Sequence, residues 1–195
     1  MRTTFDKNYY DRFYRNPKTR AVSPASAQRQ AGFIASYLKY LELPVTRILD
    51  LGCGVGTTLR ALGKAFPRAR LHGVEYSEYL CRRYGWEQGS AADYHADEPY
   101  DLVLCNDVLA YLDATECGRA IGNIARLCRG AAFLGILTRE DAGLYDPDRT
   151  DPQQWLRPAA WYRRRLGRHF LNVGGGLHLK QPLRAVVWNL DRPPR

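Results

Sequence analysis

The sequence of 195 residues lacks most features of a secreted or membrane protein. Its five cysteines are odd in number and form no C-x-x-C pair, which argues against a disulfide framework and a zinc ribbon. No apolar run approaches the roughly 18 residues that span a bilayer, and the first residues lack the apolar segment of a signal peptide. No His, Asp or Glu cluster has the spacing of a metal site. We therefore expect a soluble, cytoplasmic protein that binds no metal and no membrane.

Acidic residues are missing from one long stretch. Residues 152–190 contain seven Lys or Arg and no acid, whereas residues 71–118 contain ten acids and two arginines. Residues 1–20 add six bases against two acids, and the net charge of the chain is +9. This pattern favours an anionic substrate or partner, and a solvated basic face is the alternative.

Helical and strand patterns alternate along the chain. Helices are expected at residues 24–41, 57–66, 77–84, 113–130 and 158–166, and apolar runs predict strands at 47–51, 70–75, 100–105 and 131–138. Such runs are typical of a parallel sheet that is covered by helices on both faces. Strands at 168–173 and 184–190 have no room for a helix between them, so we expect a hairpin whose last strand is antiparallel. The fold class is therefore α/β, a doubly wound and mostly parallel sheet.

Three glycines follow the first strand, in the stretch ILDLGCGVGTTLR at residues 48–60. Gly52, Gly54 and Gly56 leave the turn without side chains, so a bulky ligand can lie on the backbone. A dinucleotide-binding turn would have its third glycine at Thr57, and Asp50 would repel a pyrophosphate. The turn instead suits a ligand that carries positive charge.

The second predicted strand ends in Glu75, 19 residues after Gly56. A carboxylate at this place can accept both hydroxyls of a ribose. A nucleoside with a cationic tail satisfies both observations, and S-adenosylmethionine is such a molecule.

Three segments resemble the motifs of class I S-adenosylmethionine-dependent methyltransferases. They are DLGCGVG at 50–56, GVEYS at 73–77 and YDLVLCNDVL at 100–109. The resemblance covers residues 45–137 well and the remainder only by architecture. It implies a seven-stranded sheet whose last strand is antiparallel, in a single domain spanning 1–195. In this domain, residues 1–44 form a lid and a helix, 45–137 the cofactor-binding core, and 138–195 the substrate side.

The resemblance also implies roles for individual residues. The methionine part of the cofactor would lie on Asp50 and the turn, the ribose on Glu75, and the adenine near Tyr76. Ser90 and Ala91 stand where the family often has an aspartate for the adenine, which puts that contact in doubt. The expected cofactor-binding set is Asp50, Gly52, Cys53, Gly54, Gly56, Glu75, Tyr76, Ser90, Ala91 and Asn106, with Tyr14 and Arg20 from the lid.

Acceptor and catalytic residues are less defined by the sequence. Tyr10, Tyr145, Arg157 and Trp161 are the substrate candidates, with Arg157 expected to hold a carboxylate by two hydrogen bonds. Packing in the core would explain Trp161 as well as a substrate contact would. Packing of an N-terminal helix on the core would likewise explain the aromatic residues near the N-terminus. Asp107, Tyr111 and His169 are candidate bases, although no base is required, because alignment alone supplies about 7–11 kcal/mol.

The sequence therefore predicts a methyltransferase that acts on a small, anionic molecule. An RNA or protein methyltransferase is one alternative, favoured by the charge, but the fourth-strand segment lacks an Asn/Asp-Pro-Pro-Tyr/Phe motif. A catalytically inactive, cofactor-binding regulatory protein is the other. The sequence leaves the acceptor atom and the oligomeric state open.

Overall fold

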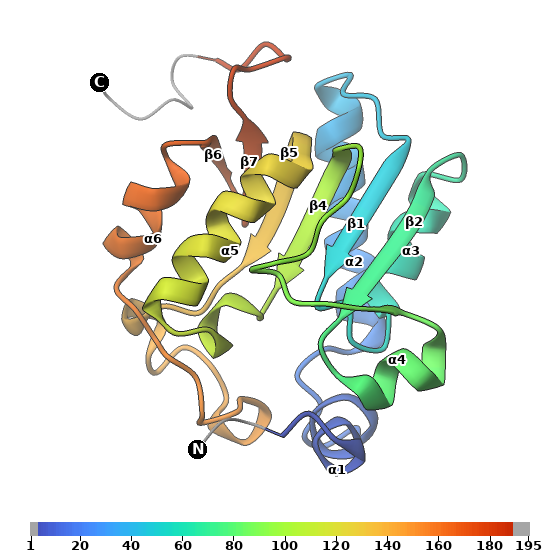
Figure 1. Ribbon diagram of the computed structural model, residues 1–195, viewed down its shortest axis with the longest axis vertical. Helices are drawn as coiled ribbons and strands as arrows, with labels where there is room; N and C mark the ends of the chain where they lie inside the picture. Colours follow the sequence, from blue (N-terminus) through green and yellow to red (C-terminus); the bar gives the residue numbers. More distant parts are fainter. Residues whose placement is uncertain (1–3, 189–195) are drawn as a thin grey trace.

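The computed structural model describes residues 4–188, and its central feature is a seven-stranded sheet in the order β3-β2-β1-β4-β5-β7-β6. β7 is antiparallel to both of its neighbours, and all other pairs are parallel. The predicted doubly wound α/β fold with an antiparallel last strand is thus confirmed (Figure 1). The strands are β1 Arg47–Leu51, β2 Arg70–Glu75, β3 Glu87–Gln88, β4 Tyr100–Asn106, β5 Cys128–Gly135, β6 Phe170–Gly174 and β7 Leu177–Lys180.

Helices cover both faces of the sheet, and each face has its own core. In Figure 1, α5 (Ala114–Leu127) and α6 (Ala159–Leu166) lie in front of the sheet, with α2 (Pro24–Tyr40) and α3 (Thr57–Ala65) behind it. Side chains of one strand alternate between the two cores. In β1, for example, Ile48 packs with α2 and α3, whereas Leu49 packs with α5.

Side-chain caps mark the starts of three helices. Ser23 caps α2 in a capping box with Ser26, and Asp113 does the same for α5 with Glu116. These caps satisfy backbone N–H groups that have no partner inside the helix. α4 (Glu78–Tyr84) begins after Ser77, whose side chain caps it.

β5 starts earlier than the sequence pattern predicts. A helix to Gly130 and a strand at 131–138 were expected, but α5 ends at Leu127 and the strand runs from Cys128 to Gly135. Gly130 lies inside the strand. A Cβ at this position would lie 2.4 Å from the carbonyl oxygen of Asp101, so the position requires glycine. The glycine thus allows close strand pairing rather than ending the helix.

The terminal hairpin is also shorter than expected. β6 ends at Gly174, and Gly175 and Gly176 follow it; all three glycines have positive φ, and the returning strand starts at Leu177. The prediction of a strand at 184–190 is wrong for residues 184–188, which are irregular, and 189–190 lie outside the described residues. Three left-handed glycines close the hairpin at once, so no longer connection is needed.

The N-terminal segment lies at the edge of the sheet where the parallel strands end (Figure 1). It consists of α1 (Lys7–Tyr10) and the π-helical turn η1 (Asp11–Arg15). Tyr10 and Phe13 are buried, yet neither belongs to the two main cores. The segment therefore covers the strand ends rather than extending the core.

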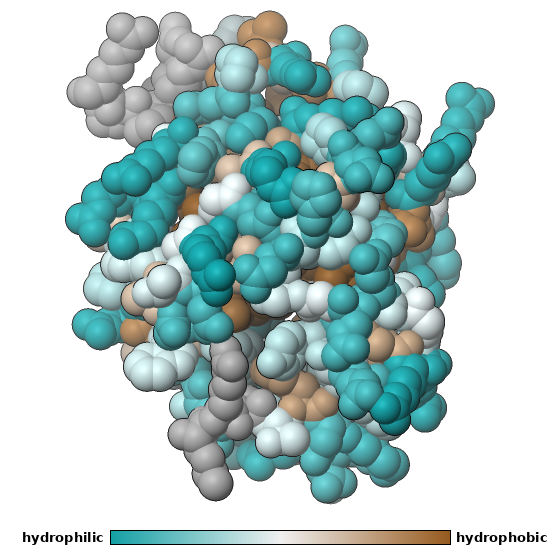
Figure 2. All heavy atoms as spheres, viewed as in Figure 1, coloured by the Kyte–Doolittle hydropathy of each residue, from teal (hydrophilic) through white to brown (hydrophobic). Residues whose placement is uncertain are grey.

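The outer surface over α5 and α6 is mostly hydrophilic (Figure 2). Arg163 and Arg164 of α6 are exposed, as is Arg168 just after it. Among residues 4–188, no helix has the length and apolar character needed to cross a membrane. All five cysteines are free, and four of them are buried.

Candidate active site

Two adjoining cavities lie where β1, β2 and β4 end. The Asp50 cavity, lined by Asp50, Arg20 and residues 145–154, measures about 380 Å³, and the Glu75 cavity, lined by Glu75, Tyr76 and residues 89–91, about 310 Å³. The two meet at a junction whose residues line both cavities: Tyr9, Tyr14, Gly52, Asn106, Asp107 and Tyr111. One elongated ligand could therefore occupy both cavities.

Glu75 is held at the end of β2 by backbone groups. The side chain is 5% exposed; Oε2 accepts the Gly54 N–H at 2.8 Å and Oε1 accepts the Ser77 N–H at 2.8 Å. The Tyr10 hydroxyl donates to Oε1 at 3.3 Å. Because a carboxylate has about four acceptor sites, it can still accept a hydroxyl from the Glu75 cavity.

Asp50 is a buried carboxylate near the end of β1. It is 4% exposed, and no donor among residues 4–188 forms a hydrogen bond with its side chain. Burial, and second the charge of Glu75, raises the pKa of Asp50 to about 7. A buried carboxylate without a partner is unfavourable, so a cationic group in this cavity would be stabilised.

The glycine turn approaches other parts of the chain closely. Gly52, Gly54 and Gly56 all have positive φ. A Cβ on Gly52 would lie 2.3 Å from Cγ2 of Val108, and one on Gly54 would lie 3.3 Å from the Tyr14 ring. The turn thus needs glycine for its backbone and for packing, in addition to the access for a ligand that the sequence predicts.

Gly56 has a different place from the other two glycines. It caps α3 and lines neither cavity. A Cβ there would lie 2.5 Å from the Trp86 ring, whose Nε1 donates to the Gly54 carbonyl at 3.0 Å. Gly56 therefore shapes the turn through Trp86.

Asp107 lies at the junction in a left-handed conformation, with φ of 56°. Its N–H donates to the Gly135 carbonyl at 2.9 Å, and its Oδ2 accepts from Asn106 Nδ2 at 2.9 Å. Burial raises the pKa of Asp107 to about 6, and the Asn106 bond limits the rise. The group can therefore exchange a proton near neutral pH.

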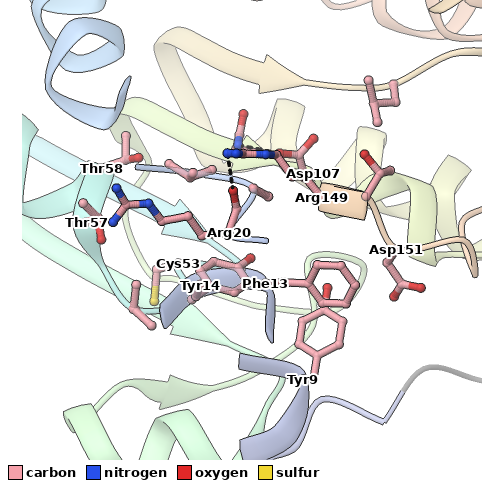
Figure 3. A pocket seen from close by; sticks show the side chains of 18 of the residues that line it. Tyr9, Phe13, Tyr14, Arg20, Cys53, Thr57, Thr58, Asp107, Arg149 and Asp151 are labelled. Atoms are coloured by element: carbon pink, nitrogen blue, oxygen red, sulfur yellow. Dashed lines mark hydrogen bonds between the residues drawn. The ribbon is translucent and has the colours of Figure 1, made fainter. Parts of the chain in front are cut away.

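Tyrosines form the rest of the junction. The hydroxyls of Tyr9 and Tyr111 are 2.9 Å apart, and Gln154 Nε2 donates to Tyr111 at 3.2 Å. Figure 3 shows Tyr9, Phe13 and Tyr14 side by side, between Cys53 and Asp151. Burial raises the pKa of Tyr111 to about 12, so it is a neutral hydrogen-bond donor rather than a base.

Two arginines reach the Asp50 cavity. Arg20 extends toward Thr57 and Thr58 (Figure 3), and its guanidinium makes no hydrogen bond or ion pair with the described residues. Arg149 pairs with Asp146 at 3.1 Å and donates to the Arg20 carbonyl at 3.4 Å. These guanidinium groups supply positive charge to a cavity that is also lined by Asp50, Asp107, Asp146 and Asp151.

Other predicted residues line the cavities as well. Ser90, Ala91, Tyr76 and Tyr10 line the Glu75 cavity, whereas Cys53 and Tyr145 line the Asp50 cavity. Tyr76 is 56% exposed, so one side of its ring is free to contact a ligand.

Arg157 lies outside both cavities, contrary to its predicted role as a substrate clamp. It is 8% exposed and donates to the carbonyls of Leu109 and Leu112 and to the Tyr162 hydroxyl. Its guanidinium also lies 5.1 Å from the Trp161 ring. These contacts of Arg157 connect the turn after β4 to α6. Arg157 and Trp161 therefore stabilise the packing of these two elements.

His169 and the arginines of α6 also lie away from the junction. His169 precedes β6 and lines neither cavity. The Arg165 guanidinium stacks on the Trp161 ring at 3.6 Å, and Arg163 faces a separate groove beside β6. The basic side chains of α6 therefore do not reach the two cavities, because α6 packs on α5 and its C-terminal end points away from the strand ends (Figure 1).

Several site residues were missed by sequence reasoning. Thr57, Thr58, Arg149, Asp151 and Gln154 all line the Asp50 cavity. The segment that carries the last three has little regular structure, so no periodicity predicts where its side chains point. Within residues 4–188, no group of three His, Cys, Asp or Glu side chains is arranged to hold a metal.

A family model described as a methyltransferase domain matches residues 49–134. Trans-aconitate 2-methyltransferase from Pseudomonas aeruginosa (strain UCBPP-PA14) is 32% identical over 154 residues, which cover 75% of this chain and 49% of that protein. Malonyl-[acyl-carrier protein] O-methyltransferase from Legionella pneumophila is 32% identical over 97 residues, 44% of this chain and 34% of that protein. The chain thus spans about a third to a half of the length of these relatives.

Solved structures share the fold at low sequence identity. Magnesium protoporphyrin IX methyltransferase (ChlM) from Synechocystis PCC 6803 with bound SAH has a TM-score of 0.65 at 20% identity, covering 91% of this chain and 96% of that one. DesVI from Streptomyces venezuelae has a TM-score of 0.64 at 19% identity, covering 90% and 97%. The family model, the sequence motifs and the sheet order agree: residues 49–134 match a methyltransferase domain, and the chain has the fold of class I methyltransferases.

Proposed function

We propose that the protein transfers a methyl group from S-adenosylmethionine to a small, anionic molecule. The observation that carries the proposal is the pair of buried carboxylates, Asp50 and Glu75, in two cavities that meet at the end of β4. Glu75 suits the hydroxyls of a ribose, and Asp50, which has no donor among the described residues, suits an ammonium group.

The remaining residues fit the same cofactor. Arg20 is free to bind the carboxylate of its methionine part, and Tyr76, Ser90 and Ala91 line the place for the adenine. When bound, the cofactor supplies a methyl group on a sulfonium that departs as a neutral thioether. The chain itself therefore has to align the acceptor and exclude water.

The junction is suited to both tasks. Tyr9, Phe13 and Tyr14 form an aromatic wall over it, and Tyr111 closes the other side. An acceptor in the Asp50 cavity has its reacting atom near Asp107. If that atom carries a proton, Asp107 can accept it, because its pKa of about 6 leaves it ionised at pH 7.

The Asp50 cavity contains two arginines beside four aspartates, so we propose that an anionic acceptor is held there by a guanidinium group. Arg149 is the arginine placed to hold it, in the role that the sequence suggested for Arg157. The named acceptors of the curated relatives, trans-aconitate and a malonyl group, also carry carboxylates.

Calorimetry with S-adenosylmethionine and its demethylated product tests the cofactor. We expect micromolar affinity for both and a rise in melting temperature by mass action. Incubation with labelled cofactor and a metabolite extract then identifies the acceptor. A well-folded protein that binds neither ligand would refute the proposal, and binding without any labelled product would indicate a regulatory role.

A further inference from the structure

Gly135 is the last residue of β5 and pairs with Asn106 at the end of β4. A Cβ on Gly135 would lie 1.9 Å from Asn106 Oδ1 and 2.8 Å from its Cγ. The φ of Gly135 is outside the left-handed region, so the backbone would tolerate alanine. Glycine is needed here only because the Asn106 amide occupies the space.

The amide that fills this space is bonded to Asp107. Asn106 Nδ2 donates to Asp107 Oδ2 at 2.9 Å, and the Gly135 carbonyl accepts the Asp107 N–H at 2.9 Å. Gly135 thus affects Asp107 in two ways. Its carbonyl accepts the Asp107 N–H, and its missing side chain leaves room for the Asn106 amide that bonds to the Asp107 carboxylate. Asp107 Oδ1 accepts no hydrogen bond from the described residues.

We infer that Gly135 and Asn106 are positioning residues, which hold the Asp107 carboxylate at the junction so that it takes a proton from a hydroxyl or amine acceptor. The proton transfer rests on the proposed function, whereas the positioning is a property of the chain alone. In the reaction, the lone pair of the acceptor atom forms the bond to the methyl carbon, and the carbon–sulfur pair leaves with the sulfur. The O–H or N–H electrons stay on the acceptor atom, and its proton moves to Asp107.

Among the groups around Asp107, Asn106 is the one whose hydrogen bond lowers the pKa of its carboxyl group. Tyr14 from η1, Tyr111 from the turn after β4 and Cys105 from β4 face it, and burial raises the pKa of each, so all three are uncharged at neutral pH. The other charged groups that line the Asp50 cavity are Asp50, Arg20, Arg149, Asp146 and Asp151, and those that line the Glu75 cavity are Glu75, Asp93 and Glu116. Among the described residues, Asp107 forms no ion pair, and the Asn106 bond favours its ionised form.

A titration of aspartate carboxyl groups by carbon NMR tests the positioning directly. Asp107→Asn assigns the resonance in the labelled, ligand-free protein. We expect Asn106→Ala to raise the pKa of Asp107 by about one unit, since one hydrogen bond to the ionised form is lost. Gly135→Ala should raise it by a similar amount, because the amide has to turn away.

Gly130→Ala is the matched control on the same strand. Its Cβ would lie 2.4 Å from the Asp101 carbonyl oxygen, far from the junction, so it should lower stability without moving the Asp107 titration. Asn106→Ala leaves the strand backbone intact, so it answers the question even if Gly135→Ala does not fold. An Asp107 titration that is unchanged in Asn106→Ala overturns the inference.

The pH profile of methyl transfer tests the proton step separately. Its acidic limb should follow the NMR pKa of Asp107 in the wild type and move upward with it in Asn106→Ala. A limb that stays in place while the NMR pKa moves would show that Asp107 takes no proton. Absence of cofactor binding would instead reject the proposed function and leave the NMR result standing.

Discussion

Replacing Glu75 by glutamine tests the most constrained carboxylate of the site. The change keeps the size of the side chain but leaves one acceptor oxygen instead of two. The N–H groups of Gly54 and Ser77 bond to different oxygens of Glu75, so an amide can accept only one of them. Its NH2 group would face the other donor.

The magnitude follows from these two bonds. A hydrogen bond to a charged acceptor contributes about 1.5–3 kcal/mol, so the free energy of unfolding should fall by about this amount. The ribose hydroxyls lose the same charged acceptor, which corresponds to a roughly 10- to 150-fold weaker cofactor. The pKa of Asp50 should also fall, because the charge of Glu75 contributes to its rise.

Urea denaturation measures the free energy of unfolding, and calorimetry with the demethylated cofactor measures the affinity. Glu78→Gln is the control, since Glu78 is exposed on α4 and pairs only with Arg82 among the described residues. It should change neither quantity measurably. A folded Glu75→Gln protein that binds the cofactor within twofold of the wild type would refute the reasoning.

Three further predictions follow from the same site. The pKa of Asp50 is about 7 in the ligand-free folded protein and 3.8 in the unfolded chain, so the folded state holds an extra proton between about pH 4 and 7. The free energy of unfolding should therefore fall as pH rises through this window. The affinity for S-adenosylmethionine should rise about tenfold per pH unit up to about pH 7, because the cofactor binds the ionised carboxylate. Calorimetry at several pH values checks the affinity, and a flat profile contradicts the role of Asp50. Deleting residues 1–20 should leave a folded domain by circular dichroism, since the side chains of residues 4–20 lie outside both cores, and should remove most turnover; normal turnover would reject the lid. Arg149→Gln should raise the KM of an anionic acceptor about tenfold without changing cofactor affinity, whereas tight RNA binding with a steep salt dependence would contradict a small-molecule acceptor.

The sequence predicts features that depend on local chemistry. Ala27, Ala31, Ile34 and Leu38 recur at helical spacing, and all four are buried in α2. The glycine turn and Glu75 are also predictable, because a ligand that lies on the backbone restricts the residue types near it. These signals lie within short segments, so they need no knowledge of the tertiary structure.

Features that depend on contacts between distant segments were not predictable. Arg157 looks like an anion-binding residue in the sequence, and only the packing of α6 against the turn after β4 shows that carbonyls occupy it. Gly135 gives no signal at all, since its role depends on Asn106, 29 residues earlier in the chain. The Asp107 φ of 56° likewise results from the pairing of two strands.

The position of β7 has a consequence for the order in which the chain can complete its sheet. β7 is the last strand of the part of the chain that the structure describes, but it lies inside the sheet, where Leu177 and Leu179 pair with Phe133 and Ala131 of β5. Until residues 177–180 are available, β5 is an apolar edge strand with unpaired backbone groups. Exposed edges of this kind pair with other chains. A ribosome-bound or C-terminally shortened chain that stops before Leu177 would therefore be prone to aggregation, although every residue of the Asp50 and Glu75 cavities has already been made.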